Sequence, residues 1–200
     1  MTPPKLILIL SENWTMTPPR DLPALVRFAV EAEDAGFDAV MVSEHVVLGP
    51  DAGSDGLPGN PRDYALPGNQ DPATPWPGSL MLLSAVAAVT TRLRLVAGAI
   101  IPPLRHPLLL AKDLATLDLL SEGRLVVQPT VSWHRAEYEA FGVEFSSRGA
   151  LLDEHLARRR LRTPLPKVGG QGLRNLRQQR ERQRASGLGL SKGDQSLSPL

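Results

Sequence analysis

The chain has 200 residues, enough for one domain of ordinary size, and 42% of them are hydrophobic, so a substantial core can be buried. It contains no cysteine, which excludes disulfides, thiolate metal sites and cysteine nucleophiles. The net charge of +1 conceals a division, because residues 1–157 hold 11 Lys and Arg against 19 Asp and Glu, whereas residues 158–200 hold 11 against 2. We therefore expect an acidic domain followed by a strongly basic tail.

The chain begins with a pattern typical of a strand followed by a helix. Residues 5–10 (KLILIL) form an apolar run of the length of a buried strand. Asp21 suits a helix N-cap and Pro23 suits the first helical turn, and apolar residues then recur three or four positions apart. Gly36 is predicted to end this helix.

A second strand is predicted over residues 37–43 (FDAVMVS), with Glu44 and His45 at its carboxyl end. Residues 46–78 are rich in Gly, Pro, Asp and Asn and show almost no periodicity. A loop this long inside a compact domain is usually functional or mobile, and the alternative is a plain insertion.

The next fifty residues predict helix, strand, helix and strand with short connections. In order, these elements cover residues 80–89, 93–101, 108–120 and 125–128. Ser79 is predicted to cap the first helix and His106 the second.

Two shorter helices are expected over residues 134–140 and 147–157. The complete order, with four strands alternating with helices, is that of a parallel α/β fold. A doubly wound sheet and a (β/α)8 barrel both begin this way, and both place their chemistry at the carboxyl ends of the strands. No Gly-rich nucleotide-binding motif follows any predicted strand.

Several blocks of the sequence resemble the bacterial luciferase-like family of flavin- and F420-dependent oxidoreductases. They occur in the family's order and spacing: FDAVMVSEH (37–45), LRLVAGAIIPPLRHP (93–107), AKDLATLDLLSEGR (111–124) and WHRAEYEAFGVEFSSRG (133–149). The resemblance spans residues 5–157 and implies the first four β/α units of a (β/α)8 TIM barrel, with the cofactor ring in the barrel mouth.

The resemblance also implies roles for particular residues. His45 occupies the position of the family's active-site histidine, with the acidic Glu44 just before it. A histidine side chain changes protonation state near physiological pH, so it can act as acid or base. Gly98 and Ala99 match the place where many members have a non-prolyl cis peptide against the cofactor ring. Glycine there would let the backbone approach a flat ring closely.

The chain departs from the family after the fourth strand. Many members have a Gly-rich run there, whereas this chain has QPTVSW (128–133). Thr130 matches a cofactor-side position. Trp133 either faces the cofactor pocket or fills the gap between this loop and the next helix.

Residues 158–200 do not continue the α/β pattern. They contain no aromatic residue and no apolar periodicity, so we expect this tail to be disordered. A full barrel needs about 250 residues, which predicts that the chain holds only the N-terminal half. We interpret the tail as unrelated to the domain, as a shifted reading frame would produce. The alternative is a basic arm with non-specific affinity for nucleic acid.

The resemblance implies an oxidoreductase that uses reduced F420, or alternatively FMN, for hydride transfer or monooxygenation of a small organic substrate. The alternative is a truncated, non-catalytic half-barrel. No apolar run approaches the ~20 residues of a membrane span and no secretion signal is recognisable, so we expect a cytoplasmic protein. Nucleic acid is not the expected partner, and a homodimer is left open.

The remaining histidines have plainer explanations. His134 is expected on the loop surface, near the rim of the pocket, and His155 is expected to be solvated on the last helix. No HExxH or comparable spacing occurs, so no metal site is predicted.

An open half-barrel has two unpaired sheet edges and one face without helices, so Val40, Val96 and Val127 are expected to be only partly covered. We predict that the purified chain self-associates and is marginally stable. Light scattering and a thermal melt check this, and a sharp two-state melt of a monomer would contradict it.

Overall fold

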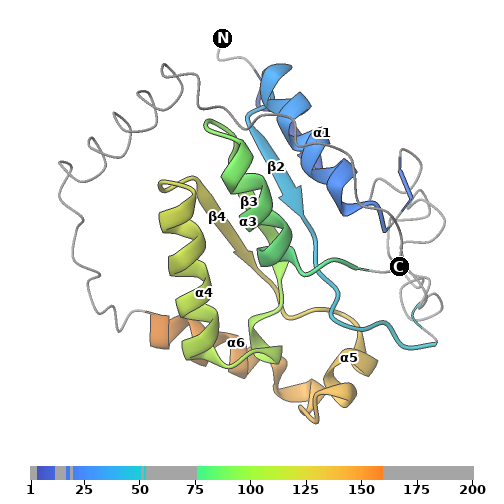
Figure 1. Ribbon diagram of the computed structural model, residues 1–200. Helices are drawn as coiled ribbons and strands as arrows, with labels where there is room; N and C mark the ends of the chain where they lie inside the picture. The colour runs from blue at the N-terminus through green and yellow to red at the C-terminus, as the bar shows by residue number, and fades with distance from the viewer. Residues whose placement is uncertain (1–3, 12–16, 19, 51, 53–75, 160–200) are drawn as a thin grey trace, which may run out of the picture. The chain divides into compact units, whose positions relative to one another are not determined.

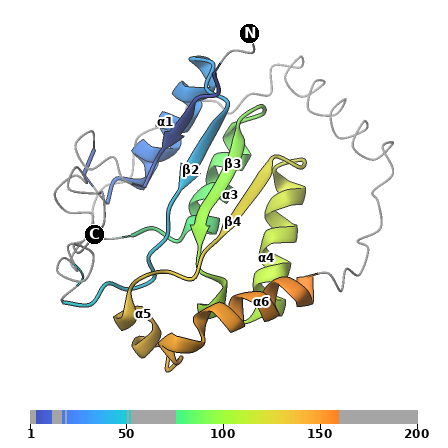
Figure 2. The same ribbon diagram turned by 180° about the vertical axis from the view of Figure 1, so that it is seen from behind.

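The computed structural model describes residues 4–11, 17–18, 20–50, 52 and 76–159. Within these ranges the chain forms one parallel sheet with helices on one of its faces (Figures 1 and 2). Most of the predicted loop 46–78 and nearly all of the predicted tail 158–200 lie outside the described residues.

The elements follow the predicted order. The strands are β1 (Ile7–Ile9), β2 (Ala39–Val42), β3 (Arg94–Ile100) and β4 (Leu125–Pro129). The helices that follow the first three strands are α1 (Leu22–Asp34), α3 (Ser79–Val89) and α4 (Pro107–Leu120), with a 3₁₀ turn, η1 (Pro102–Leu104), before α4. After β4 come α5 (Arg135–Ala140), the 3₁₀ turn η2 (Phe145–Ser147) and α6 (Arg148–Arg159).

The sheet topology distinguishes the two folds that the sequence allowed. The strands lie side by side in chain order, β1-β2-β3-β4, and every neighbouring pair is parallel. A doubly wound sheet would reverse its order part-way and carry helices on both faces. Here α1, α3 and α4 cover the same face (Figures 1 and 2). The described part of the chain is therefore the beginning of a singly wound, barrel-like α/β fold.

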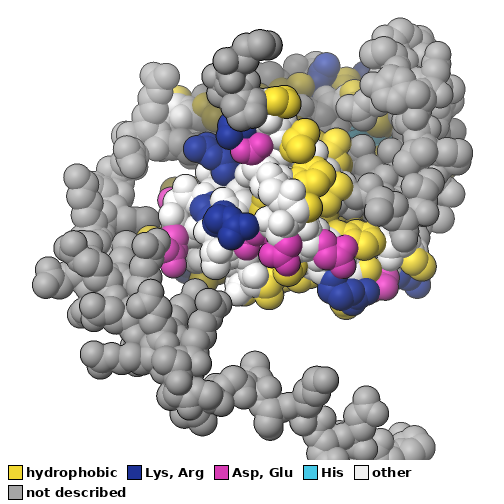
Figure 3. Space-filling view, turned by 90° about the horizontal axis from the view of Figure 1, so that it is seen from above, with side chains coloured by type: hydrophobic (Ala, Val, Ile, Leu, Met, Phe, Trp, Pro, Cys, Tyr) yellow, Lys and Arg dark blue, Asp and Glu magenta, His cyan; other side chains and the backbone are white. Residues whose placement is uncertain are grey.

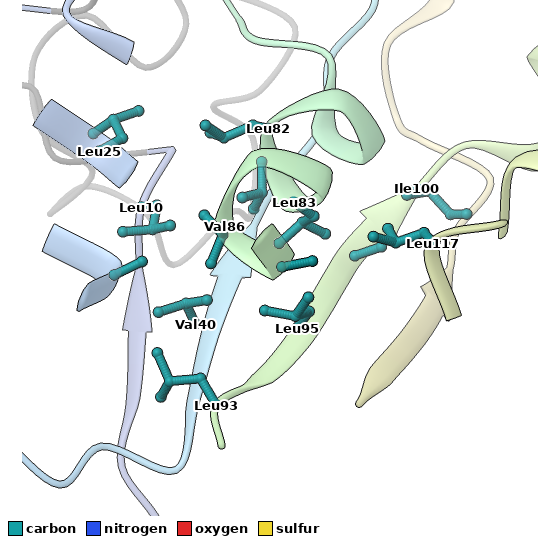
Figure 4. Close-up of a cluster of buried hydrophobic side chains, with 14 of the residues drawn as sticks. Leu10, Leu25, Val40, Leu82, Leu83, Val86, Leu93, Leu95, Ile100 and Leu117 are labelled. Atoms are coloured by element: carbon teal, nitrogen blue, oxygen red, sulfur yellow. The ribbon is translucent and has the colours of Figure 1, made fainter. Parts of the chain in front are cut away.

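The core lies between the sheet and its covering helices (Figure 4). Val40 of β2 and Leu95 of β3 are fully buried there against Leu83 and Val86 of α3. Side chains alternate between the faces of a strand, so the intervening residues point to the opposite face.

This alternation corrects the prediction of partial exposure for Val40 and Val96, whereas Val127 is partly covered as predicted. Val40 is fully buried because it points toward the helices. Val96 faces the other side but keeps only 9% exposure, and its register partner Met41 lies beside it. Val127 is partly buried and packs against the helix-side core.

The predicted helix caps are only partly correct. The Asp21 side chain caps α1, because its Oδ1 accepts a hydrogen bond from the Ala24 N–H at 3.0 Å. For α3 the N-cap is Gly78, and Ser79 is the first helical residue with its hydroxyl directed to Glu44. His106 occupies the N-cap position of α4, but its side chain makes no capping hydrogen bond.

At the amino ends of the strands, a buried carboxylate holds the segment that leads into β3. The Glu33 side chain accepts hydrogen bonds from the N–H groups of Thr91, Arg92 and Leu93, at 2.9, 2.5 and 3.0 Å. Burial of Glu33 disfavours its charged form, but these three donors together with the Arg92 charge lower its pKa below the ordinary value. Figure 3 shows this end of the molecule, where basic and acidic side chains are interspersed.

Glu33→Gln is predicted to lower the free energy of unfolding by about 2 kcal/mol at neutral pH, because the N–H groups of Thr91, Arg92 and Leu93 lose a charged acceptor. The pKa of Glu33 is lowered on folding, so its contribution is present above the unfolded-state value and is lost as pH falls through the folded-state value. Urea unfolding at a series of pH values checks this. The gap between wild type and variant should shrink below the ordinary glutamate pKa of 4.5, and a gap that is constant with pH would contradict the assignment.

Candidate active site

The carboxyl ends of β2, β3 and β4 meet at one edge of the sheet, because the strands are parallel and adjacent. His45 follows β2, Gly98 and Ala99 lie at the end of β3, and Thr130 follows β4. The helix α5 also lies at this end of the sheet (Figures 1 and 2). The parallel register therefore gathers the residues that the sequence singled out.

His45 contacts a buried carboxylate on α5. Its Nδ1 atom lies 3.2 Å from Oε1 of Glu137, whose side chain is fully buried. The same oxygen accepts a hydrogen bond from the Val46 N–H at 2.8 Å, and Oε2 accepts one from the Ser132 hydroxyl at 2.7 Å. Glu137 thus connects the segment after β2 to the segment after β4.

The protonation of this pair follows from its surroundings. Burial of Glu137 favours its neutral form, but the hydrogen bond and charge of His45, with the donors Ser132 and Val46, lower its pKa below the ordinary value. Glu137 is therefore ionised at neutral pH and can only accept hydrogen bonds. The proton in the contact must lie on His45 Nδ1, which leaves Nε2 as the nitrogen that can gain or lose a proton.

Two tryptophans enclose the His45 ring. Trp76 stands edge-on to it with ring centroids 4.9 Å apart, and Trp133 does so at 5.5 Å. The His45 side chain is only 12% exposed to solvent. The contact between Trp133 and His45 is the one expected if Trp133 faces the candidate site. Trp133 also packs on the His134 ring, with ring centroids 5.0 Å apart.

Glu44 precedes His45 but contacts different elements. Its Oε1 accepts hydrogen bonds from the Ser79 hydroxyl at 2.7 Å and from Arg105 at 2.5 Å, and its Oε2 accepts one from the Ile101 N–H at 3.0 Å. The Glu44 side chain is 2% exposed, so its charge is paired and hydrogen-bonded in the interior. It joins the end of β2 to the start of α3 and to the segment after β3.

The end of β3 has an irregular backbone. The peptide bond between Gly98 and Ala99 is cis, as the resemblance implies. The pairing with β4 shifts register here, since Gly98 pairs with Gln128 but Ile100 pairs with Pro129. A Cβ atom on Gly98 would lie 3.0 Å from the side chains of Gln128 and Val96 and 3.1 Å from Met41 Sδ. The absence of a side chain at Gly98 therefore lets these three neighbours pack closely over it.

His134 is not on the surface, contrary to prediction. It is fully buried, and its Nε2 accepts a hydrogen bond from the Gly49 N–H at 2.7 Å. A Cβ atom on Gly49 would lie 2.6 Å from the Ala136 Cβ, so only glycine allows this approach. His134 therefore fixes the described start of the long loop against α5. His155, expected to be solvated, is half-buried on α6.

Glu137, Ser132 and Trp76 were not predicted as site residues. Glu137 and Ser132 lie in or next to a block that carries the resemblance, but a glutamate in a short polar helix gives no local sign of burial. Trp76 is at the far end of the unperiodic loop 46–78. Glu137 and Trp76 contact His45, which lies 92 and 31 positions away, whereas Ser132 enters the site only through its contact with Glu137, five positions along the chain.

Two further properties concern the described residues alone. No group of three His, Asp or Glu side chains among them is arranged to hold a metal ion. None of their helices has the length and apolar character needed to cross a membrane.

The known proteins to which this chain is similar include enzymes that depend on different cofactors. The chain is 36% identical over 111 residues to an F420-dependent glucose-6-phosphate dehydrogenase of Beutenbergia cavernae, covering 54% of this chain and 26% of the relative. It is 41% identical over 64 residues to an FMNH2-dependent dimethylsulfone monooxygenase of Pseudomonas fluorescens, covering 32% and 17%. The chain spans less than half the length of the curated mycobacterial relatives it matches, 43% of one and 45% of another.

A solved structure and a family profile agree with the fold described above. The structure of monooxygenase RslO1 from Streptomyces bottropensis superposes with a TM-score of 0.58 at 27% identity, covering 78% of this chain and 42% of that one. The profile described as luciferase-like monooxygenase matches residues 5–163, which include every described strand and helix. The chain therefore belongs to the luciferase-like monooxygenase family.

Proposed function

We propose that this chain forms the cofactor-facing part of an oxidoreductase that uses reduced F420, with FMN as the alternative cofactor, to act on a small organic substrate. The observation that carries the proposal is the contact between His45 and the buried Glu137 at the carboxyl edge of the sheet. It orients an acid–base group where parallel α/β enzymes place their chemistry.

In this proposal His45 moves a proton at Nε2. The ionised Glu137 holds the other ring proton on Nδ1 and stabilises the imidazolium when Nε2 accepts a proton. Trp76 and Trp133 restrict rotation of the His45 ring and keep water from most of its surface. Glu44 is a positioning residue, because its hydrogen bonds fix the backbone on which His45 stands.

The end of β3 is the proposed seat of the planar cofactor ring. Gly98 has no side chain there, and one would crowd Met41 and Gln128 on the helix-free face. Gly98, Ala99 and Thr130 would hold the ring, with Trp133 at its margin. When bound, the reduced cofactor would supply the hydride, or the electrons for oxygen insertion.

The relatives support F420 as the first choice. The F420-dependent relative matches 54% of this chain, whereas the FMNH2-dependent relative matches 32%. The names of both relatives refer to small-molecule substrates, which supports a small substrate for this chain. The chain spans less than half of its mycobacterial relatives, so catalysis by this chain alone is part of the proposal.

The proposal predicts that the purified chain binds F420 with micromolar affinity and FMN more weakly, as measured by the fluorescence of either ring. Gly98→Ala should weaken binding about ten-fold, because the added methyl would displace the closely packed side chains of Met41, Val96 and Gln128 at the proposed ring site. Gly149→Ala is the matched control, since a Cβ there meets nothing within 4 Å. If the wild-type chain binds neither cofactor, the proposal fails and a non-catalytic half-barrel is favoured.

Glu44→Gln is predicted to lower the free energy of unfolding by about 2 kcal/mol, because Arg105 loses its partner and the Ile101 N–H loses a charged acceptor. Chemical unfolding followed by circular dichroism measures this. Unchanged stability together with lost turnover would instead give Glu44 a direct role in the chemistry.

A further inference from the structure

Ser132 has an unusual backbone conformation. Its φ angle is +57°, in the left-handed region that only glycine enters without cost, and Glu122 is the other non-glycine residue with a positive φ in the described part of the chain. Glu122 lies in the exposed turn after α4. Ser132 lies in the segment that joins β4 to α5, beside the candidate site.

The hydrogen bonds of the Ser132 side chain explain why a serine occupies this unfavourable backbone conformation. Its hydroxyl donates to Oε2 of Glu137 at 2.7 Å and accepts a hydrogen bond from the His134 N–H at 3.3 Å. Glycine would suit the backbone better but would remove the donor. Two of the three donors to the buried carboxylate come from the segment of His45 and Val46, so Ser132 is the one that holds Glu137 from the other side.

We propose that Ser132 is a positioning residue for the proposed acid–base pair. By engaging Oε2, its hydroxyl fixes the rotation of the Glu137 carboxylate and leaves Oε1 for Nδ1 of His45. The left-handed backbone is what directs the short serine side chain to that oxygen. The inference rests on the proposed function for its significance, but the geometry that it explains belongs to the chain alone.

A competing explanation is that the hydroxyl serves only the loop, through the His134 N–H. In that case, removing it would affect stability but not the His45–Glu137 contact. The two explanations differ in a spectroscopic readout, the exchange with water of the His45 Nδ1 proton. That proton can be observed by NMR in the full chain without any cofactor, and its signal is assigned by its loss in His45→Gln.

Three substitutions at Ser132 separate the hydroxyl from the backbone. Ser132→Gly and Ser132→Ala both remove the donor, and proton exchange should become about ten-fold faster in each, the equivalent of one hydrogen bond to a charged group. The denaturation midpoint should be higher for glycine than for alanine, because glycine tolerates the positive φ. Ser132→Thr keeps the hydroxyl but is β-branched, so exchange should stay slow while the midpoint falls.

The matched control is Glu122→Gly, which relieves a similar φ of 56° away from the site and should leave the exchange rate of the His45 proton unchanged. Wild-type exchange in both Ser132→Gly and Ser132→Ala would overturn the proposal, as would fast exchange in Glu122→Gly. If Ser132→Thr does not fold, the exchange rates of Ser132→Gly and Ser132→Ala, compared with that of Glu122→Gly, still decide between the two explanations. These measurements contain no cofactor, so a failure of the proposed function would show in the fluorescence titration and not here.

Discussion

The described part of the chain depends on a single constraint, which is that backbone N–H groups outside regular structure need acceptors. Three buried glutamates meet this need. Glu33 accepts from the N–H groups that lead into β3, Glu44 accepts from the N–H of Ile101, the N-cap of η1, and Glu137 accepts from the N–H of Val46. Each carboxylate lies on a helix or at a strand end and holds a segment distant in sequence. The sheet is thus fastened at both ends by charges that are costly to bury and are retained because they are fully engaged.

A buried glutamate accepts several hydrogen bonds at each end of the sheet, but its partners differ between the two ends. At the amino ends, the Glu33 carboxylate accepts hydrogen bonds from three backbone N–H groups and the Thr91 hydroxyl, while Arg92 donates to the Glu33 carbonyl, and the result is a fixed corner. At the carboxyl ends, Glu137 contacts a backbone donor, a hydroxyl and an imidazole. A carboxylate that would otherwise be purely structural is thereby connected to a group that exchanges protons, which is how the fold and the proposed chemistry meet.

Local patterns in the sequence predicted much of this architecture. The strands and helices were expected in the right order, because burial on one face of a sheet and on one stripe of a helix leaves a clear period. Asp21 was identified as a cap because capping involves residues only three positions apart. Ser79 and His134 were assigned wrongly for the opposite reason, since their partners, Glu44 and Gly49, are 35 and 85 positions away. The same distance hid Glu137, whereas His45 became a candidate through a family resemblance and not through periodicity.

Glu44 and His45 are neighbours in the chain, yet one is directed to α3 and η1 and the other to α5. Adjacent residues after one strand are therefore held by separate parts of the fold, and under the proposed function the first is structural and the second chemical. In such an arrangement, the residue at position 45 can be substituted without disrupting the hydrogen bonds of Glu44 that hold the end of β2. The evolutionary freedom of the site, and its use in redesign, would then reside in position 45 and its aromatic surroundings, while position 44 remains under the constraints of the scaffold.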